Sequence, residues 1–218
     1  MIGKLYKIIL DFIRSIDFLT QLIWKIKVQK KLLPITYDLT SLVLKKTIVK
    51  YNNNYFFNSH LDMGCGQIAI LGQFHKKINS SISITSADIY DEFLDNAKKN
   101  SDLNKLEITF IQTNMFSNIK DKYDLITFNP PYVPLRFKFK EIKFDKISYS
   151  GEKGTNAIEL FLDSAGNFLT EKGVIFLGVN LFYVPLDYLK ELISNYKYKI
   201  IEKIKMSPNK CIVLVLRK

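Results

Sequence analysis

The chain has 218 residues, enough for one well-buried domain and too few for two ordinary ones. Its composition, 47% apolar and 24% charged, is typical of a folded globular protein and excludes a disordered one. The net charge of +11 fits a nucleic-acid or acidic partner, and equally well a general excess of lysine. Cys65 and Cys211 lie far apart with only two histidines in the chain, so we predict no metal site and no disulfide.

The first 33 residues predict an amphipathic helix that ends at Pro34. Charged residues interrupt its apolar runs, and no small-residue cleavage site follows, so we expect neither a membrane span nor a signal peptide in a cytoplasmic protein. We expect residues 1–34 to be a helical extension that packs on the main domain, residues 35–218. A dimer contact is the second choice and an interfacial membrane helix the third.

A second helix is expected from about Thr36 to Lys50, before the loop "YNNN". Short apolar runs then alternate with helical stretches, which indicates an α/β fold with a mainly parallel sheet and helices on both faces. The last two runs have a short connection that suits an antiparallel pair. The expected strands are residues 56–64, 81–89, 106–114, 123–129, 173–180, 199–204 and 211–217, and the helices between them are 68–77, 91–100, 156–169 and 185–195.

The first two strands end in residues that suit a nucleoside ligand. The first ends in "LDMGCGQ", where Gly64 and Gly66 allow positive φ and a close approach of the backbone. The third glycine of a dinucleotide fingerprint is missing, because Ile68 stands in its place. The second strand ends in Asp88, twenty-two residues after Gly66, where a carboxylate can accept hydrogen bonds from ribose hydroxyls. The alternative is that Asp88 or Asp91 caps the next helix.

The third and fourth strands end in asparagines at the same expected edge of the sheet. The side-chain carbonyl of Asn114 can accept a hydrogen bond from an adenine amino group. Asn129 is followed by Pro130, Pro131 and Tyr132. Because prolines cannot donate ladder hydrogen bonds, the strand must stop there in a stiff turn.

These motifs resemble those of class I S-adenosylmethionine-dependent methyltransferases, in particular the amino-methylating group with the sequence (D/N)PPY. The segment "YSGEKGTNAIELFLDSAGNFLTEKGVIFL" is similar to the one that follows NPPY in HemK-type protein-glutamine methyltransferases. The resemblance extends from about Ile35 to Lys218. It implies a Rossmann-like seven-stranded sheet and S-adenosylmethionine as cofactor, bound by Asp62, Gly64, Gly66, Asp88, Ile89 and Asn114. Asn114 stands where the family usually has aspartate, so we expect a weakened adenine contact.

The resemblance also implies a catalytic role for Asn129, Pro130 and Tyr132. If the side-chain oxygen of Asn129 and the carbonyl of Pro130 each accept one N–H bond, a planar substrate nitrogen is fixed for methyl transfer. Tyr132 can then pack against the flat substrate group. The first candidate substrate is a protein glutamine side chain in a loop, and the second is a base in RNA or DNA. A small molecule is third, and a non-catalytic binding subunit is last.

The stretch "LRFKFKEIKFDK", Leu135 to Lys146, alternates basic and aromatic residues. Such a pattern can hold a phosphate backbone and stack bases. It is also typical of an amphipathic strand or hairpin with solvated lysines, which we slightly favour. Related enzymes act with their own helical domain or a small activating partner, so a partner protein or a homodimer through the N-terminal helix is also expected.

Overall fold

The structure is a computed structural model that describes residues 17–28, 32, 37–137, 148–206 and 210–218. Seven strands form one sheet in the order β3-β2-β1-β4-β5-β7-β6. The five strands from β3 to β5 pair in parallel, and β7 is antiparallel to both β5 and β6, which confirms the predicted fold and final antiparallel pair. The strands are β1 (Ser59–Met63), β2 (Ser83–Asp88), β3 (Thr109–Gln112), β4 (Tyr123–Phe128), β5 (Leu169–Asn180), β6 (Lys199–Lys205) and β7 (Cys211–Arg217).

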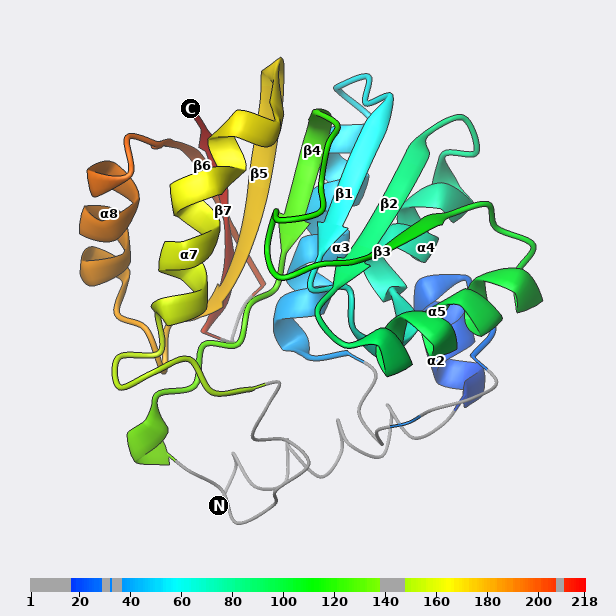
Figure 1. The fold of residues 1–218 in the computed structure, drawn as a ribbon, viewed down its shortest axis with the longest axis horizontal. Coiled ribbons are helices and arrows are strands. Elements are labelled where there is room, and N and C mark those ends of the chain that lie inside the picture. Colours follow the sequence, from blue (N-terminus) through cyan, green and yellow to red (C-terminus); the bar gives the residue numbers. More distant parts are fainter. Residues whose placement is uncertain (1–16, 29–31, 33–36, 138–147, 207–209) are drawn as a thin grey trace.

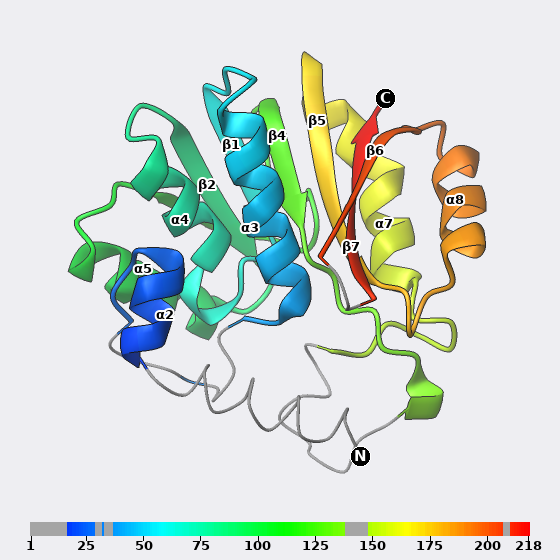
Figure 2. The ribbon, with the colours of Figure 1, turned by 180° about the vertical axis from the view of Figure 1, so that it is seen from behind.

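Helices cover both faces of this sheet. Helix α7 lies in front of β5 in Figure 1, and α3 lies in front of β1 and β4 in the reverse view of Figure 2. Neighbouring strand residues such as Leu125 and Ile126 therefore belong to two separate apolar cores, one on each face. The described helices are α2 (Asp17–Trp24), α3 (Leu39–Asn52), α4 (Ile70–Ile78), α5 (Asp91–Leu103), α7 (Asn156–Ala165) and α8 (Leu186–Asn195), with 3₁₀ turns η1 (Gly66–Ile68), η2 (Leu135–Phe137) and η3 (Gly166–Phe168).

The prediction of one helix running to Pro34 is wrong at its end. Helix α2 stops at Trp24, and Lys25 has a left-handed φ of 57°. Beyond it, Ile26 and Val28 are buried while Lys27 between them is exposed. Alternate burial requires extended backbone, because a helix cannot direct residues two apart to one face. Most of the predicted extension, residues 1–16, 29–31 and 33–36, lies outside the described residues.

The described part of the N-terminal segment packs against the main domain. The ring of Trp24 meets Tyr37 at 5.3 Å and Phe74 of α4 at 5.8 Å, both edge to face. This contact anchors the segment on the same face of the sheet as α3 and α4. Within the described residues, no helix combines the length and the apolar character that a membrane crossing needs.

Helix α3 lies unusually close to the middle of the sheet because one strand residue is a glycine. A Cβ atom on Gly178 of β5 would lie 2.6 Å from the methyl group of Thr40 and 2.9 Å from a methyl group of Leu44. The helix starts with a capping box in which Asp38 accepts a hydrogen bond from the Ser41 amide. The close packing therefore fixes the position of Asp38 at the carboxyl edge of the parallel strands.

We expect Gly178→Ala to lower the free energy of unfolding by about 1–3 kcal/mol, because the added methyl group overpacks the contact with α3. Urea denaturation measures this change. Adding Thr40→Ser, which removes the nearest methyl group and keeps the hydroxyl, should restore part of the loss. A Gly178→Ala variant that unfolds at the wild-type urea concentration would contradict this account of the contact.

Candidate active site

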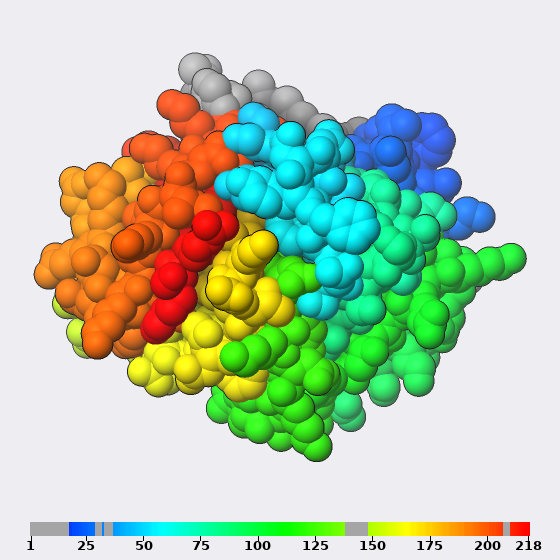
Figure 3. All heavy atoms as spheres, turned by 90° about the horizontal axis from the view of Figure 1, so that it is seen from above, coloured from blue at the N-terminus to red at the C-terminus, as the bar shows by residue number. Residues whose placement is uncertain are grey.

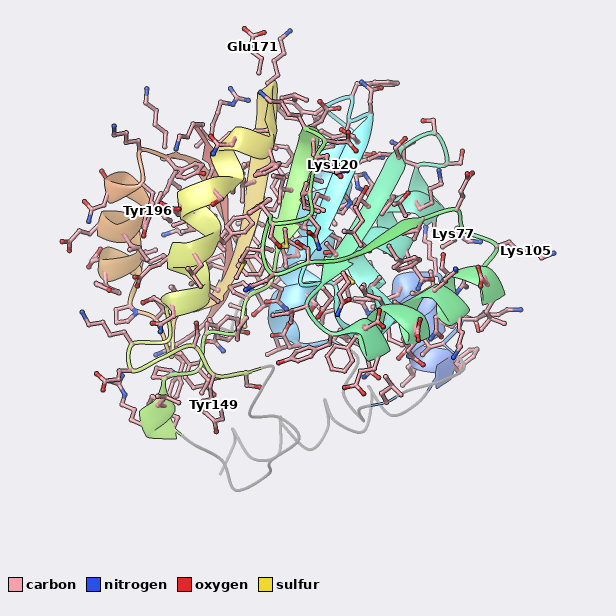
Figure 4. All side chains as sticks on the ribbon, in the orientation of Figure 1. Lys77, Lys105, Lys120, Tyr149, Glu171 and Tyr196 are labelled. Atoms are coloured by element: carbon pink, nitrogen blue, oxygen red, sulfur yellow. The ribbon has the colours of Figure 1, made fainter. Side chains whose placement is uncertain are left out.

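A cavity of about 530 Å³ opens at the carboxyl ends of β1, β2 and β4 and beside the residues that follow β3. This is the lower edge of the sheet in Figure 1, and Tyr149 in Figure 4 lies at the same edge. Figure 3 views the opposite edge, where Glu171 and Lys120 of Figure 4 lie. The volume is typical of small-molecule sites. The cavity brings together Asp62, Gly64, Gly66, Asp88, Ile89, Asn114 and Asn129, and it is not lined by Pro130 or Tyr132.

Asp88 ties the end of β2 to the glycine turn. Its carboxylate accepts hydrogen bonds from the Gly66 amide at 2.8 Å and from the Tyr90 amide at 3.0 Å. Gly64 and Gly66 have φ of 62° and 66°, so the turn needs glycine at both positions. Burial raises the pKa of Asp88, and backbone hydrogen bonds from Tyr90, Gly66 and Ile89 act in the opposite direction. A carboxylate offers about four lone-pair sites, so Asp88 can still accept a hydrogen bond from a ligand in the cavity.

Asn114 and Ile89 occupy the outer part of the same cavity. Ile89 is 49% exposed and follows Asp88 directly, so its side chain offers apolar surface at the cavity rim. Asn114 is exposed, and the chain turns back after it because Met115 has a left-handed φ of 50°. The Thr113 hydroxyl stabilises this turn by donating to the Met115 carbonyl at 2.9 Å. Both predicted residues are thus at the edge where β2 and β3 end.

Asp62 lies at the floor of the cavity with both oxygens engaged. It accepts hydrogen bonds from the Thr127 hydroxyl at 2.9 Å and from the Gly72 amide at 3.1 Å. Gly72 permits this contact, since a Cβ atom there would lie 2.7 Å from the Ser86 hydroxyl. Burial raises the pKa of Asp62 to about 7, more than its hydrogen bonds lower it. Asp62 therefore titrates near neutral pH.

A buried chain of polar side chains continues from Asp62 away from the cavity. The Thr127 hydroxyl lies 2.8 Å from Nε2 of His60, whose Nδ1 lies 3.2 Å from Nδ1 of His75. His75 in turn lies 3.3 Å from the side-chain oxygen of Asn52 at the end of α3. Burial lowers the pKa of His60 well below its usual value and that of His75 to about 4, so both rings are neutral at pH 7.

The direction of these hydrogen bonds depends on the proton of Asp62. Thr127 has one O–H group, and when it donates to an ionised Asp62 it must accept the N–H of His60. When Asp62 is protonated it can donate to Thr127, whose hydroxyl then donates to His60. The protonation of Asp62 is therefore coupled to the tautomer of a histidine in β1.

The side-chain amide of Asn129 is held on one side only. Its Nδ2 donates to the Asp38 carboxylate at 3.1 Å and to the Ser41 hydroxyl oxygen at 3.2 Å. Its Oδ1 is buried and has no hydrogen-bond partner among the described residues. An unsatisfied buried carbonyl is costly, and here it belongs to a residue that lines the cavity. The arrangement offers an acceptor to a ligand N–H or O–H group.

Tyr132 lies behind the cavity wall, where it has no access to the cavity. Its hydroxyl donates to Asp38 at 2.6 Å and lies 2.8 Å from the Thr40 hydroxyl, while its ring stacks on Tyr183 at 6.1 Å. Burial, followed by the charge of Asp38, raises the pKa of Tyr132 well above its usual value, so the phenol stays protonated. The predicted packing against a flat substrate is not the contact that this structure shows. Pro131 lines the cavity instead.

Several residues of the site were missed from the sequence. Asp38, Thr40 and Ser41 join the Asn129 turn from the start of α3, and Thr127, His60 and His75 support Asp62. The signal in "DLTS" was present, since an acid three residues before a serine is a helix-capping pattern. That pattern predicts where a helix starts, and it does not show which loop the cap meets. The stretch from Lys138 to Lys146 lies outside the described residues.

Comparisons with known proteins agree with the fold. The family model of the methyltransferase small domain matches residues 36–204. A solved structure of a ribosomal protein L11 methylase from Lactobacillus delbrueckii subsp. bulgaricus has a TM-score of 0.63 at 18% identity, covering 82% of this chain and 78% of that one. At this identity the likeness shows the fold alone.

Three curated relatives give the sequence likeness. A protein of Methanocaldococcus jannaschii named as a protein N5-glutamine methyltransferase is 29% identical over 78% of this chain and 83% of its own length. A release factor glutamine methyltransferase of Lactococcus lactis is 28% identical over 71% of this chain, which spans 58% of that relative. A ribosomal RNA small subunit methyltransferase C of Haemophilus ducreyi is 36% identical over 67% of this chain and 40% of its own length.

We expect Asp62→Asn to stabilise the protein increasingly as pH rises from about 4 to 7. In this window folded Asp62 holds a proton that the unfolded chain has lost, so its contribution to stability falls with rising pH. The lowered pKa values of His60 and His75 change the stability with pH in the opposite direction, but they do so equally in the wild type and in Asp62→Asn. Asparagine can accept from Gly72 and donate to Thr127. The gain should approach the order of 4 kcal/mol near pH 7.

Urea denaturation at several pH values from 5 to 8 measures this difference. Asp187→Asn at the exposed start of α8 is the control, and it should follow the wild-type curve. Parallel stability curves for wild type and Asp62→Asn would show that Asp62 does not titrate in this range.

Proposed function

Because the chain belongs to the methyltransferase small domain family and is an S-adenosylmethionine-dependent methyltransferase, we propose that it methylates a glutamine side-chain amide in a protein. The observation that carries this proposal is the buried carbonyl oxygen of Asn129, a residue that lines the cavity, which has no hydrogen-bond partner in the described part of the chain. A primary amide has two N–H groups and needs two acceptors to fix it. The side-chain oxygen of Asn129 offers one acceptor, and we assign the second to the main-chain carbonyl of Pro130, although Pro130 does not line the cavity.

The described cavity suits S-adenosylmethionine. Its volume matches a ligand of this size, and the positive φ values of Gly64 and Gly66 let the backbone approach closely. Among the described lining residues there are acids and no lysine or arginine, which favours a cationic ligand. The cofactor supplies a methyl group on a positively charged sulfur, which makes that carbon electrophilic.

We assign the predicted cofactor residues individual tasks. Asp88 has free lone pairs for the ribose hydroxyls, and Asn114 has an exposed side chain for the adenine amino group. Gly64 and Gly66 keep the turn open, and Ile89 gives apolar contact at the rim. Asp62 places negative charge at the cavity floor and holds the start of α4 through Gly72.

The chain's own residues contribute position and charge to the transfer. An amide nitrogen is a poor nucleophile because its lone pair is delocalised, so holding it in line with the methyl carbon is the main requirement. Asn129 and Pro130 fix its two N–H groups, and their dipoles meet the positive charge that grows on nitrogen. The sulfur–carbon bond breaks as the nitrogen–carbon bond forms, and one amide proton leaves to water.

A second candidate is base N-methylation in RNA. The relative from Haemophilus ducreyi and the net charge of +11 support it. A cluster of aromatic side chains also lies next to the NPPY turn, with Phe137 packed on Phe182 and Tyr183. Arg136 lies 5.1 Å from the Phe137 ring and Lys210 lies 6.0 Å from the Phe182 ring, so cations and rings are interleaved there.

The proposal also covers the N-terminal segment and the partners of the protein. We propose that residues 1–34 form an extension distinct from the methyltransferase domain, residues 35–218, and that it braces α3 and α4 through contacts like that of Trp24. A small activating partner or a homodimer through this extension is a further part of the proposal.

We expect Asn129→Ala to lower methyl transfer about 100-fold or more, because it removes one of two acceptors for the substrate nitrogen. The assay measures labelled methyl from S-adenosylmethionine transferred into a methyl-poor cell extract. Strong acid converts an N-methylated amide into labelled methylamine, which identifies a glutamine product, whereas nuclease releases label that is carried by bases. The exposed Asn195→Ala is the control and should keep wild-type activity.

Label that nuclease releases would support the RNA candidate over the glutamine candidate. Label that is small and resists both nuclease and protease would favour a metabolite. Transfer that does not depend on Asn129 would contradict both nitrogen-methylation proposals.

We expect Asp88→Ala to weaken binding of S-adenosylhomocysteine about 10-fold to 100-fold, as hydrogen bonds to a charged group contribute roughly 1.5–3 kcal/mol. Isothermal titration calorimetry measures the dissociation constant. Asp91→Ala, an exposed acid three residues further on, is the matched control and should bind normally. An unchanged constant for Asp88→Ala would remove Asp88 from the cofactor site.

A further inference from the structure

The carboxylate of Asp38 collects four hydrogen bonds from two distant parts of the chain. Its Oδ1 accepts from the Ser41 amide at 2.7 Å, from the Ser41 hydroxyl at 2.8 Å and from Nδ2 of Asn129 at 3.1 Å. Its Oδ2 accepts from the Tyr132 hydroxyl at 2.6 Å. Three of these hydrogen bonds converge on Oδ1, which is therefore saturated as an acceptor. Two of its donors belong to the helix cap and two to the NPPY turn.

These contacts leave only one orientation for the Asn129 amide. Ser41 has a single O–H group and donates it to Asp38, so its oxygen can only accept from Asn129. Both neighbours of the amide on this side are therefore acceptors. An amide rotated by 180° would place its carbonyl oxygen against a carboxylate and a hydroxyl oxygen, which is repulsive. The NH₂ group must face Asp38, and the carbonyl oxygen must face the other way.

We propose that Asp38 is a positioning residue that fixes the Asn129 carbonyl toward the substrate and so selects an acceptor nitrogen that carries N–H groups. This inference rests on the proposed function, because it assumes that Asn129 holds the substrate nitrogen. Without Asp38, the amide of Asn129 is free to present its NH₂ group instead. Such an amide would hold a carbonyl and repel the N–H groups of the substrate.

The scaffold around Asp38 is rigid enough for this role. Helix α3 packs closely against β5 where Thr40 meets Gly178. At its other end, Lys50 and Tyr51 bind the Glu202 carboxylate of β6. The Thr40 hydroxyl also lies 2.8 Å from the Tyr132 hydroxyl, and this contact helps to hold that hydroxyl in position against Asp38. Asp38 therefore cannot move without disturbing packed elements.

The charge of Asp38 adds to its orienting effect. Asp38 itself lines the cavity, next to the residue that is proposed to hold the reacting nitrogen. Positive charge develops on that nitrogen as the methyl group is transferred. A fixed negative charge close by stabilises it more than it stabilises the neutral amide of the ground state.

Asp38→Ser and Asp38→Asn test the proposal. Serine keeps the helix cap but is too short to reach Asn129, so transfer of labelled methyl into the methyl-poor extract should fall about 10-fold to 100-fold at saturating S-adenosylmethionine. The melting temperature and the affinity for S-adenosylhomocysteine should stay close to wild type. Asparagine can still accept from Asn129, so it should recover part of the rate. Asp187→Ser, at the start of α8, is the matched control and should be fully active.

The double variant separates positioning from a structural role. If Asp38 acts mainly through Asn129, then Asp38→Ser should slow Asn129→Ala much less than it slows the wild type, and the remaining loss measures the charge of Asp38 alone. The side-chain amide signals of Asn129 in a ¹⁵N spectrum should also shift and broaden in Asp38→Ser. Equal and independent losses in the double variant, or unchanged amide signals, would overturn the proposal.

The result for Asn129→Ala shows which claim has failed. If Asn129→Ala is fully active, the proposed function is wrong. If Asn129→Ala is inactive and Asp38→Ser has the wild-type rate, only the positioning role is wrong.

Discussion

The site depends on the register in which the parallel strands pair. Met63 of β1 is opposite Ala87 of β2 and Phe128 of β4, so the next residues of all three strands lie at one level of the sheet edge. The glycine turn, Asp88 and Asn129 follow these three positions directly. Parallel strands also leave backbone N–H groups free at this edge, and Asp88 uses two of them. Regular pairing of apolar strands thus brings together side chains that are far apart in sequence.

Charge is distributed unevenly over the molecule. The chain carries a net charge of +11, yet Asp38, Asp62 and Asp88 line the cavity with no lysine or arginine among its described lining residues. All three acids accept hydrogen bonds from N–H or O–H donors. Burial in addition raises the pKa of Asp62 to about 7, so it is partly protonated near neutral pH. An acidic cavity in a basic protein separates cofactor binding from any attraction of an acidic substrate surface.

Much of this organisation could be predicted from the sequence, and the parts that could not depend on long-range contacts. Apolar runs predicted every strand, and the residues at their ends predicted which side chains line the cavity. The end of α2 was missed because Trp24 packs on Phe74 and Ile26 is buried in the same core, and local periodicity does not contain such long-range contacts. The role of Asp38 was missed for the same reason. Tyr132 was expected in the cavity because the motif shows that the turn is rigid without showing which way its last side chain points.

Asp38 is far in sequence from Asn129 and Tyr132, and this separation affects the order in which the site forms during synthesis. The hydrogen bonds to Asn129 and Tyr132 close loops of 91 and 94 residues. Contacts at such separations form late, because the entropy of the loop must be lost before they contribute. During translation, β1 to β3 leave the ribosome before β4 does, while the start of α3 has long been available. The half of the site around Asn129 is therefore completed after the half built from β1 to β3, and it also needs β5, against which α3 packs.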